Sequence, residues 1–245
     1  MKKVKAKYIL GLTATPVRKD GHHPIVIMQC GPIRFRVHAI DAAKARPFKH
    51  KMIPRLTGVQ ISPGKDQSSV QEIYKLLISD DDRNQLIAED IIKAVQEGRS
   101  PLLLTERIDH LHILESLLSG KVDHLIIFKG GMGKKQRMNL TEKLENISSG
   151  EERVLLATGR YIGEGFDDPR LDTLFLALPI SWRGTLQQYA GRLHRMYDGK
   201  KEVHIYDYVD SQIPMLMRMY EKRLKGYKAI GYSISERNGK SERLF

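Results

Sequence analysis

Cysteine is almost absent from this sequence. Its 245 residues include one, Cys30, which excludes an intrachain disulfide and a metal site built from several thiolates. A chain without disulfides is typical of a reducing compartment, so we expect a cytoplasmic protein.

Long apolar runs are also missing. No stretch approaches the roughly 20 residues that a membrane-spanning helix needs. The lysine-rich start leads only into a short apolar stretch that ends at Pro16. We therefore expect no signal peptide, no anchor and no membrane partner.

Acidic residues are in deficit: 29 Asp and Glu face 41 Lys and Arg, for a formal net charge of +12. Such an excess favours polyanions, because binding releases the counterions condensed on a phosphate backbone. DNA or RNA is thus the first candidate partner, and a basic but inert surface is the alternative. With 6 Phe, 1 Trp and 10 Tyr, stacking on bases is not the evident mode of binding.

Apolar segments alternate with amphipathic ones from residue 80 onward. We expect strands at 101–104, 124–128, 153–157, 173–178 and 203–208, and helices at 80–97, 108–118, 134–147, 185–195 and 214–230. This alternation predicts an α/β fold, a parallel sheet with helices on both faces.

The flanking regions are less regular. Residues 8–12 read as a short buried strand, 18–79 as a connector with some strand pairing but no core, and 233–245 as a polar tail. Glycines and prolines interrupt the connector. It leaves room for a helix near 25–29 and extended pieces at 33–40 and 52–61.

Polar motifs follow three of the predicted strands: 105–107, 129–137 and 158–167. Because the carboxyl ends of parallel strands share one edge, we expect a single ligand-binding rim. Its glycines let a polyanion approach the backbone, and Lys134, Lys135 and Arg137 add charge. Asp167 is placed to accept hydrogen bonds from a ribose. A glycine-rich turn of purely steric origin is the alternative.

Two other kinds of site find no support. Residues 130–135 are not a phosphate-binding P-loop, which would need glycine at Phe128 and a hydroxyl at Lys135. The histidine pairs His22-His23 and His110-x-His112 lack partner ligands, so we expect no metal site.

The segment 188–195, Gln-Tyr-Ala-Gly-Arg-Leu-His-Arg, carries two arginines three residues apart. On a helix, Arg192 and Arg195 would lie on one face, one turn apart. Guanidinium groups bind phosphoryl oxygens bidentately and stabilise the charge of a transferred phosphoryl group. An ordinary amphipathic helix with solvated arginines is the alternative.

Four of these segments resemble motifs III, IV, V and VI of superfamily 2 helicases. They are 12–16, 102–107, 154–158 with 163–167, and 188–195, in that order. The likeness is greatest to the DEAD/DEAH-like branch that includes excision-repair helicases and type III restriction subunits. Such enzymes have two RecA-like lobes, with ATP between them and nucleic acid across both. The resemblance implies that 1–79 is the end of the first lobe plus a connector, and 80–232 the second RecA-like lobe.

The resemblance also implies roles for single residues. Arg192 and Arg195 would be arginine fingers, with Gln188 nearby. Gly165 and Asp167 would line the nucleotide side of the cleft, and Thr13 and Thr15 would couple the lobes. The residues implied to hold the nucleic-acid backbone are Thr105, Arg107, Gly130, Gly131, Arg137 and Thr158.

The phosphate-binding lysine and the Mg-binding Asp-Glu pair of the first lobe are not in this sequence. We therefore expect a C-terminal fragment that uses ATP and Mg only with the missing N-terminal lobe and is inactive alone. ATP would close the lobes and hydrolysis would open them, moving the strand. Contacts to phosphates predict salt-sensitive binding that tolerates any sequence.

Two alternatives stay open. One is a nucleic-acid-binding module without motor function, and the other is a restriction or repair subunit that translocates on duplex without unwinding it. DNA is favoured over RNA by family likeness alone.

Overall fold

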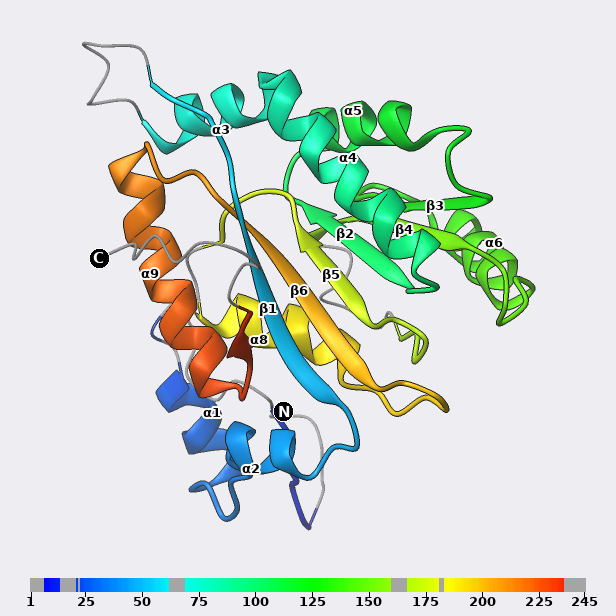
Figure 1. Cartoon of the computed structure of the whole chain (residues 1–245). Helices are drawn as coiled ribbons and strands as arrows, with labels where there is room; N and C mark the ends of the chain where they lie inside the picture. Colours follow the sequence, from blue (N-terminus) through cyan, green and yellow to red (C-terminus); the bar gives the residue numbers. More distant parts are fainter. Residues whose placement is uncertain are drawn as a thin grey trace.

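One parallel sheet organises the residues that the structure describes (Figure 1). The structure is a computed structural model, and it describes residues 7–13, 21, 23–61, 69–159, 167–180 and 183–235. The strands are β1 (Lys49–Leu56), β2 (Pro101–Thr105), β3 (His124–Phe128), β4 (Arg153–Thr158), β5 (Thr173–Leu176), β6 (Glu202–Val209) and β7 (Ser233–Ile234). Their order is β3-β4-β2-β5-β6-β1-β7, and every pair is parallel. The predicted α/β fold is confirmed.

Helices cover both faces of this sheet. They are α1 (His23–Cys30), α2 (Ala39–Lys44), α3 (Val70–Ser79), α4 (Asp81–Gln96), α5 (Ile108–Leu118), α6 (Lys134–Glu145), α8 (Arg183–Leu193) and α9 (Pro214–Ala229). Apolar residues of α4 and α5 pack on one face, and those of α6, α8 and α9 on the other. Side chains of alternate strand residues point to opposite faces of the sheet. Leu102 and Leu104 pack on the face covered by α8, whereas Leu103 packs on the face covered by α4.

Local signals set the helix ends. The carboxylate of Asp80 accepts the N–H of Arg83 at 2.8 Å and caps α4, which ends before Gly98 with its φ of 73°. Pro214 opens α9, where its missing N–H costs no helical hydrogen bond.

Two expectations for the first eighty residues are wrong. Residues 8–12 form no strand, and Tyr8 and Leu12 are 83% and 86% exposed, because no described strand pairs with them. The stretch 18–79 is not free of core, since β1 joins the sheet and Met52 is fully buried. The extended piece expected at 52–61 overlaps the second half of this strand. Pro54 lies past the two residues of β1 that pair with β7, where a missing N–H is tolerated.

Helix α3 is the other element that the sequence analysis missed. Ser69 and Glu72 form a capping box: the Ser69 hydroxyl accepts the Glu72 N–H, and the Glu72 carboxylate accepts the Ser69 N–H at 2.7 Å. The predicted tail also begins as structure, since 233–234 pair with β1 as β7. The helix predicted near 25–29 is present as α1.

A buried ion pair fixes α9 to the sheet. Arg223 donates from Nε and Nη2 to the two carboxylate oxygens of Asp207 at 2.7 and 2.9 Å, and Tyr227 donates its hydroxyl to the same carboxylate. Arg223 also donates to the carbonyl of Ile180. Both charged groups are almost fully buried, so each depends on the other for compensation.

We predict that Arg223→Met lowers the free energy of unfolding by about 3–5 kcal/mol, because it leaves the Asp207 carboxylate buried without its cation. Urea unfolding followed by circular dichroism measures this. Lys222→Met, on the exposed side of the same helix, is the control and should unfold close to the wild type. Equal midpoints for the two variants would contradict the assignment.

Candidate functional site

The carboxyl ends of three strands bring several predicted residues together. Thr105 at the end of β2 lies opposite Thr158 at the end of β4. The Thr158 hydroxyl accepts the backbone N–H of Gly130, which follows β3, at 3.2 Å. Gly131 has a φ of 86°, a left-handed conformation that favours glycine, and both glycines are exposed. The structure therefore places these four residues at one edge of the sheet, and the binding of a ligand there stays a prediction.

The hydroxyl of Thr105 faces inward. Thr105 is 1% exposed, and its Oγ1 lies 3.1 Å from Nδ1 of His110. Nε2 of His110 lies 2.9 Å from the Oδ1 of Asn84, whose amide nitrogen donates to the carbonyl of Ile78. Burial lowers the pKa of His110 to about 3, so the ring is neutral at pH 7. Nε2–H therefore donates to Asn84, and Nδ1 accepts from Thr105.

His110 thus holds the Thr105 side chain in place from the interior of the protein, a role that was not predicted from the sequence. Thr105 also accepts the N–H of Arg107 at 3.4 Å, which places Arg107 at the start of α5. The Arg107 guanidinium donates to the side chain of Gln71 on α3. The predicted contact of Thr105 with a nucleic-acid backbone stays a prediction, and its hydroxyl has internal partners here.

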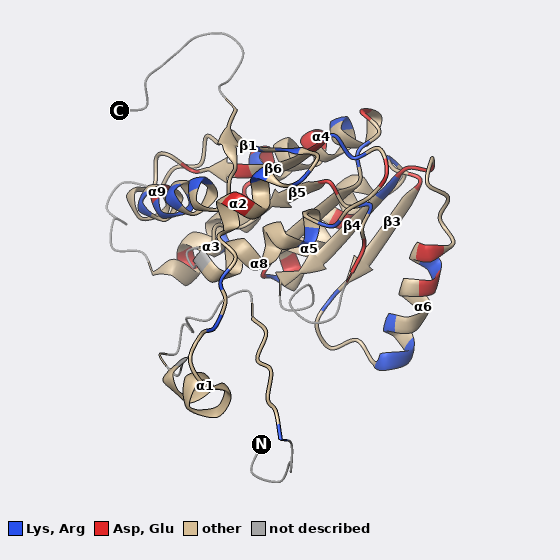
Figure 2. Cartoon of the chain, turned by 90° about the horizontal axis from the view of Figure 1, so that it is seen from below, with Lys and Arg blue, Asp and Glu red and all other residues tan. Residues whose placement is uncertain are grey.

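Basic side chains gather at the start of α6, next to the rim (Figure 2). Lys134, Lys135 and Arg137 are exposed there, and Gln136 caps the helix by accepting the Gly133 N–H at 3.2 Å. This helix lies beside β3, so its charges extend the rim at the edge of the sheet.

Asp167 lies at the opposite edge, so the expectation of one rim is wrong for this residue. The next residue, Asp168, pairs at 2.8 Å with Arg153, the first residue of β4. A chain that leaves the end of β4 must return along the sheet to begin the parallel strand β5. At roughly 3.3 Å per residue, the six residues of β4 separate the two edges by about 20 Å.

The arginines of the predicted finger segment join Asp167 at this amino-terminal edge. Arg195 donates from Nε to Asp167 at 2.8 Å, and the two side chains are 57% and 53% exposed. Helix α8 ends at Leu193, so Arg195 lies just beyond it instead of on its face. Arg192 occupies the last turn. Burial lowers the pKa of its guanidinium, while the charge of Asp167 opposes that shift.

The remaining predicted residues are scattered. Gln188 is exposed on α8, and Thr13 is exposed in a segment without regular structure. Gly165 and Thr15 lie outside the described residues.

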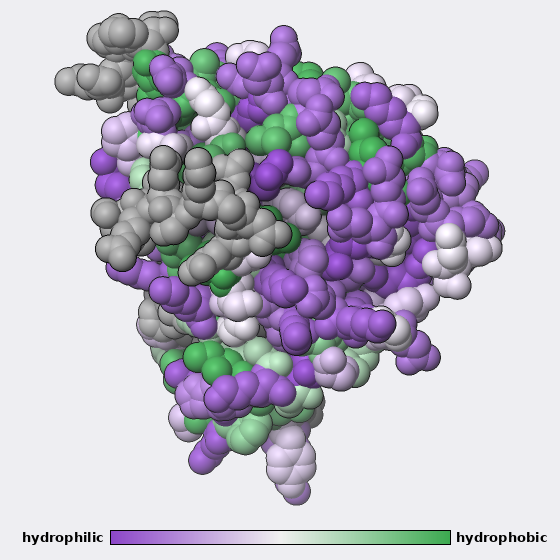
Figure 3. All heavy atoms as spheres, in the orientation of Figure 1, coloured by the Kyte–Doolittle hydropathy of each residue, from purple (hydrophilic) through white to green (hydrophobic). Residues whose placement is uncertain are grey.

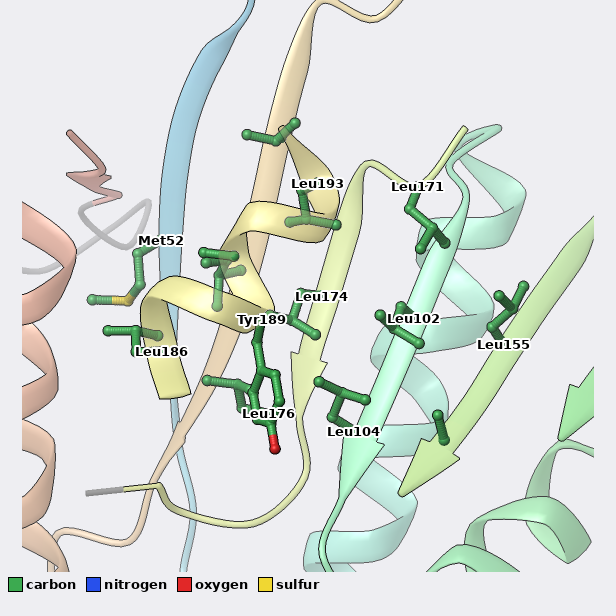
Figure 4. Packing of buried hydrophobic residues seen from close by; sticks show 14 of the residues in the cluster. Met52, Leu102, Leu104, Leu155, Leu171, Leu174, Leu176, Leu186, Tyr189 and Leu193 are labelled. Atoms are coloured by element: carbon green, nitrogen blue, oxygen red, sulfur yellow. The ribbon is translucent and has the colours of Figure 1, made fainter. Parts of the chain in front are cut away.

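Tyr189 connects the two edges. It is buried on α8, one turn before Arg192, and its ring runs along the sheet toward the carboxyl ends of the strands (Figure 4). Its hydroxyl oxygen occupies the space that the Cβ atom of any larger residue at position 159 would need. Burial, with a contribution from the charge of Glu106, raises the pKa of Tyr189 to about 12 and keeps the hydroxyl neutral. No local pattern signals this contact, because its two residues are thirty positions apart.

Two classes of feature are missing from the described ranges. No group of three or more His, Cys, Asp or Glu side chains there is arranged to hold a metal ion. Among the helices described, none is both long and apolar enough to cross a membrane.

We predict that Gly159→Ala destabilises the chain by about 1–3 kcal/mol, because the new methyl group overlaps the Tyr189 hydroxyl. Tyr189→Phe removes that hydroxyl and should restore most of the loss in the double variant. Thermal and urea unfolding of the two single variants and the double variant measure the coupling. Gly150→Ala, with nothing within 4 Å of the added atom, is the control. Additive effects would show that the contact is absent.

Comparison with known proteins gives relatives in viruses. No protein-family model matches the chain. Putative helicase 161L of Invertebrate iridescent virus 6 is 27% identical over 241 residues, which cover 93% of this chain and 51% of that protein. Transcript termination protein OPG145 of vaccinia virus (strain Copenhagen) is 25% identical over 197 residues, 77% of this chain and 38% of its own length. This chain thus spans about half or less of these two relatives.

A third relative is shorter. Uncharacterized protein 108L of Invertebrate iridescent virus 3 is 39% identical over 92 residues, which cover 38% of this chain and 84% of that protein. The two chains therefore belong to one family.

Solved structures agree with the fold. T4 UvsW aligns with a TM-score of 0.58 and 18% identity, over 77% of this chain and 41% of that one. Dbp5 of S. cerevisiae, bound to RNA and ADP BeF3, aligns with a TM-score of 0.56 and 14% identity, over 87% and 48%. The chain thus has the RecA-like α/β fold of these structures, and its relatives include a protein named as a putative helicase.

Proposed function

We propose that this chain is the C-terminal lobe of an ATP-dependent DNA or RNA helicase or translocase. The observation that carries this proposal is the division of the lobe: two arginines and Asp167 lie at one edge of the sheet, and an exposed glycine-rich and basic rim at the other. One lobe can thereby meet a nucleotide and a nucleic acid at separate places. The helicase names of relatives and the RNA and ADP BeF3 of the Dbp5 structure support this assignment.

Arg195 is suited to meet a phosphate. Its guanidinium is exposed and is paired with one exposed carboxylate, an ion pair that solvent screens and that costs little to break. Arg192, held in the last turn of α8, adds a second positive charge within range of the same carboxylate. ATP, when bound, supplies the phosphoryl group that is transferred to water, and these guanidinium groups would stabilise its charge.

The rest of the ATP site is assigned to another lobe. The phosphate-binding lysine and the acidic Mg ligands belong, in this proposal, to an N-terminal RecA-like lobe. Apolar side chains of α1, among them Ile25 and Met28, are 53% and 80% exposed, and green patches mark this end of the molecule in Figure 3. Exposed apolar surface of this kind is a common mark of an interface, and the N-terminal lobe would cover it.

We predict ATPase activity in trans. This chain, mixed with a separately produced N-terminal lobe, Mg and nucleic acid, should hydrolyse ATP, whereas the chain alone should not. Arg195→Ala and Arg192→Ala should each lower kcat by about 10³-fold or more, the usual contribution of an arginine finger. Arg218→Ala, an exposed arginine on α9, is the matched control.

Two outcomes would contradict this assignment. Turnover by the chain alone, proportional to protein and abolished by Arg192→Ala, would show that the site is complete without a second lobe. A folded pair of lobes that binds nucleic acid but does not hydrolyse ATP would favour a non-catalytic binding module.

We also predict that nucleic-acid binding depends strongly on salt. Arg137→Ala should weaken binding of every oligonucleotide sequence and reduce the slope of log K against log salt by about 1. Lys143→Ala, at the far end of the same helix, is the control. Fluorescence anisotropy with single-stranded DNA and RNA of equal length measures both effects and identifies the preferred polymer. An affinity indifferent to salt would overturn the prediction.

A further inference from the structure

The ammonium group of Lys200 lies among four backbone carbonyl oxygens. Nζ is 2.7 Å from the oxygen of Pro169, 2.8 Å from that of Leu171, 3.1 Å from that of Leu193 and 2.9 Å from that of Arg195. Its three N–H donors are shared among these four acceptors. Nζ also lies 5.6 Å from the centre of the Phe48 ring. Such convergence of carbonyls on one cation is unlike a solvated surface lysine.

These carbonyls come from the two segments that present the Arg195–Asp167 pair. Leu193 ends α8, so its carbonyl has no acceptor role within the helix, and Lys200 satisfies it. Arg195 bears the exposed guanidinium, and Pro169 follows Asp167 by two residues. The Lys200 side chain therefore joins the backbone of Arg195 to the backbone two residues after Asp167.

The charge of Lys200 suits this position. Burial lowers its pKa to about 8, with Asp172 and Asp168 opposing the shift, so the ammonium form prevails at pH 7. A cation beside the last carbonyls of α8 also interacts favourably with the helix dipole. Gly199, with a φ of 79°, forms the turn that brings Lys200 back under the end of the helix.

We propose that Lys200 is a positioning residue for the arginine site. Its ammonium group joins the end of α8 to the loop before β5 and thereby holds Arg195 and Asp167 in position. This inference rests on the proposed function for its catalytic consequence. We propose no contact of Lys200 with the nucleotide or with the nucleic acid. It acts through Arg195, on the edge of the sheet opposite the nucleic-acid rim.

The test is Lys200→Met, which keeps an unbranched stem beside Phe48 but removes every donor. In the two-lobe ATPase assay, kcat should fall by roughly 10–100-fold, as expected for a displaced catalytic group, while the Kd for the oligonucleotide stays within about twofold. Amide hydrogen exchange of this chain should quicken at 168–172 and 193–200 but not in β2 or β4. Lys201→Met, an exposed neighbour, should match the wild type in every readout.

A chemical rescue separates positioning from loss of packing. In a Cys30→Ser background, Lys200→Cys should behave like Lys200→Met, and aminoethylation of its thiol should restore kcat and slow exchange. If Lys200→Met does not fold, Lys200→Gln replaces it under the same readouts.

The outcomes are distinct. Unchanged kcat and exchange in Lys200→Met would overturn the inference, as would a uniform quickening of exchange that aminoethylation does not reverse. If wild-type lobes show no ATPase, the proposed function fails, and the exchange measurement still decides whether Lys200 joins the two segments.

Discussion

The all-parallel sheet is the constraint on which the rest of the structure depends. Every connection between neighbouring strands must run back along the sheet, so loops after strands gather at one edge and loops before strands at the other. The glycines after β3 and the threonines that end β2 and β4 meet at the first edge. Asp167, Arg192 and Arg195 meet at the second. The sheet therefore holds apart two groups of residues that the proposed function assigns to different ligands.

Helix α8 makes contacts at both edges of the sheet. Tyr189 extends from it to Gly159 at the carboxyl edge, and Lys200 binds its last carbonyl at the amino edge. Apolar side chains between these contacts pack the helix against the strands (Figure 4). A displacement of the backbone at Gly159 would thus act on the helix that carries Arg192, which is a physical route for coupling nucleic-acid binding to the arginines.

Much of the fold was predictable because each element from residue 80 onward combines an apolar pattern with a cap or a breaker, such as Asp80 before α4 and Pro214 at the start of α9. β1 was predicted only in part, as an extended piece at 52–61, because Pro54 interrupts its pattern and the sequence does not show that it joins the main sheet. The single rim was wrong for Asp167 because motif order does not show where the chain turns back. His110, Tyr189 and Lys200 were missed because each also contacts a residue far away in the sequence, namely Asn84, Gly159 and Pro169, and such contacts leave no local pattern.

We expect nucleic acid to bind at the edge of this lobe opposite the arginine site. Backbone NMR of the isotope-labelled chain, titrated with a single-stranded oligonucleotide at low salt, distinguishes the two edges. We predict chemical-shift changes at 105–107, 129–137 and 158–159, with little change at 167–172 and 192–200. Changes centred on 192–200 instead would place the nucleic acid on the arginines and would contradict the assignment of the two edges.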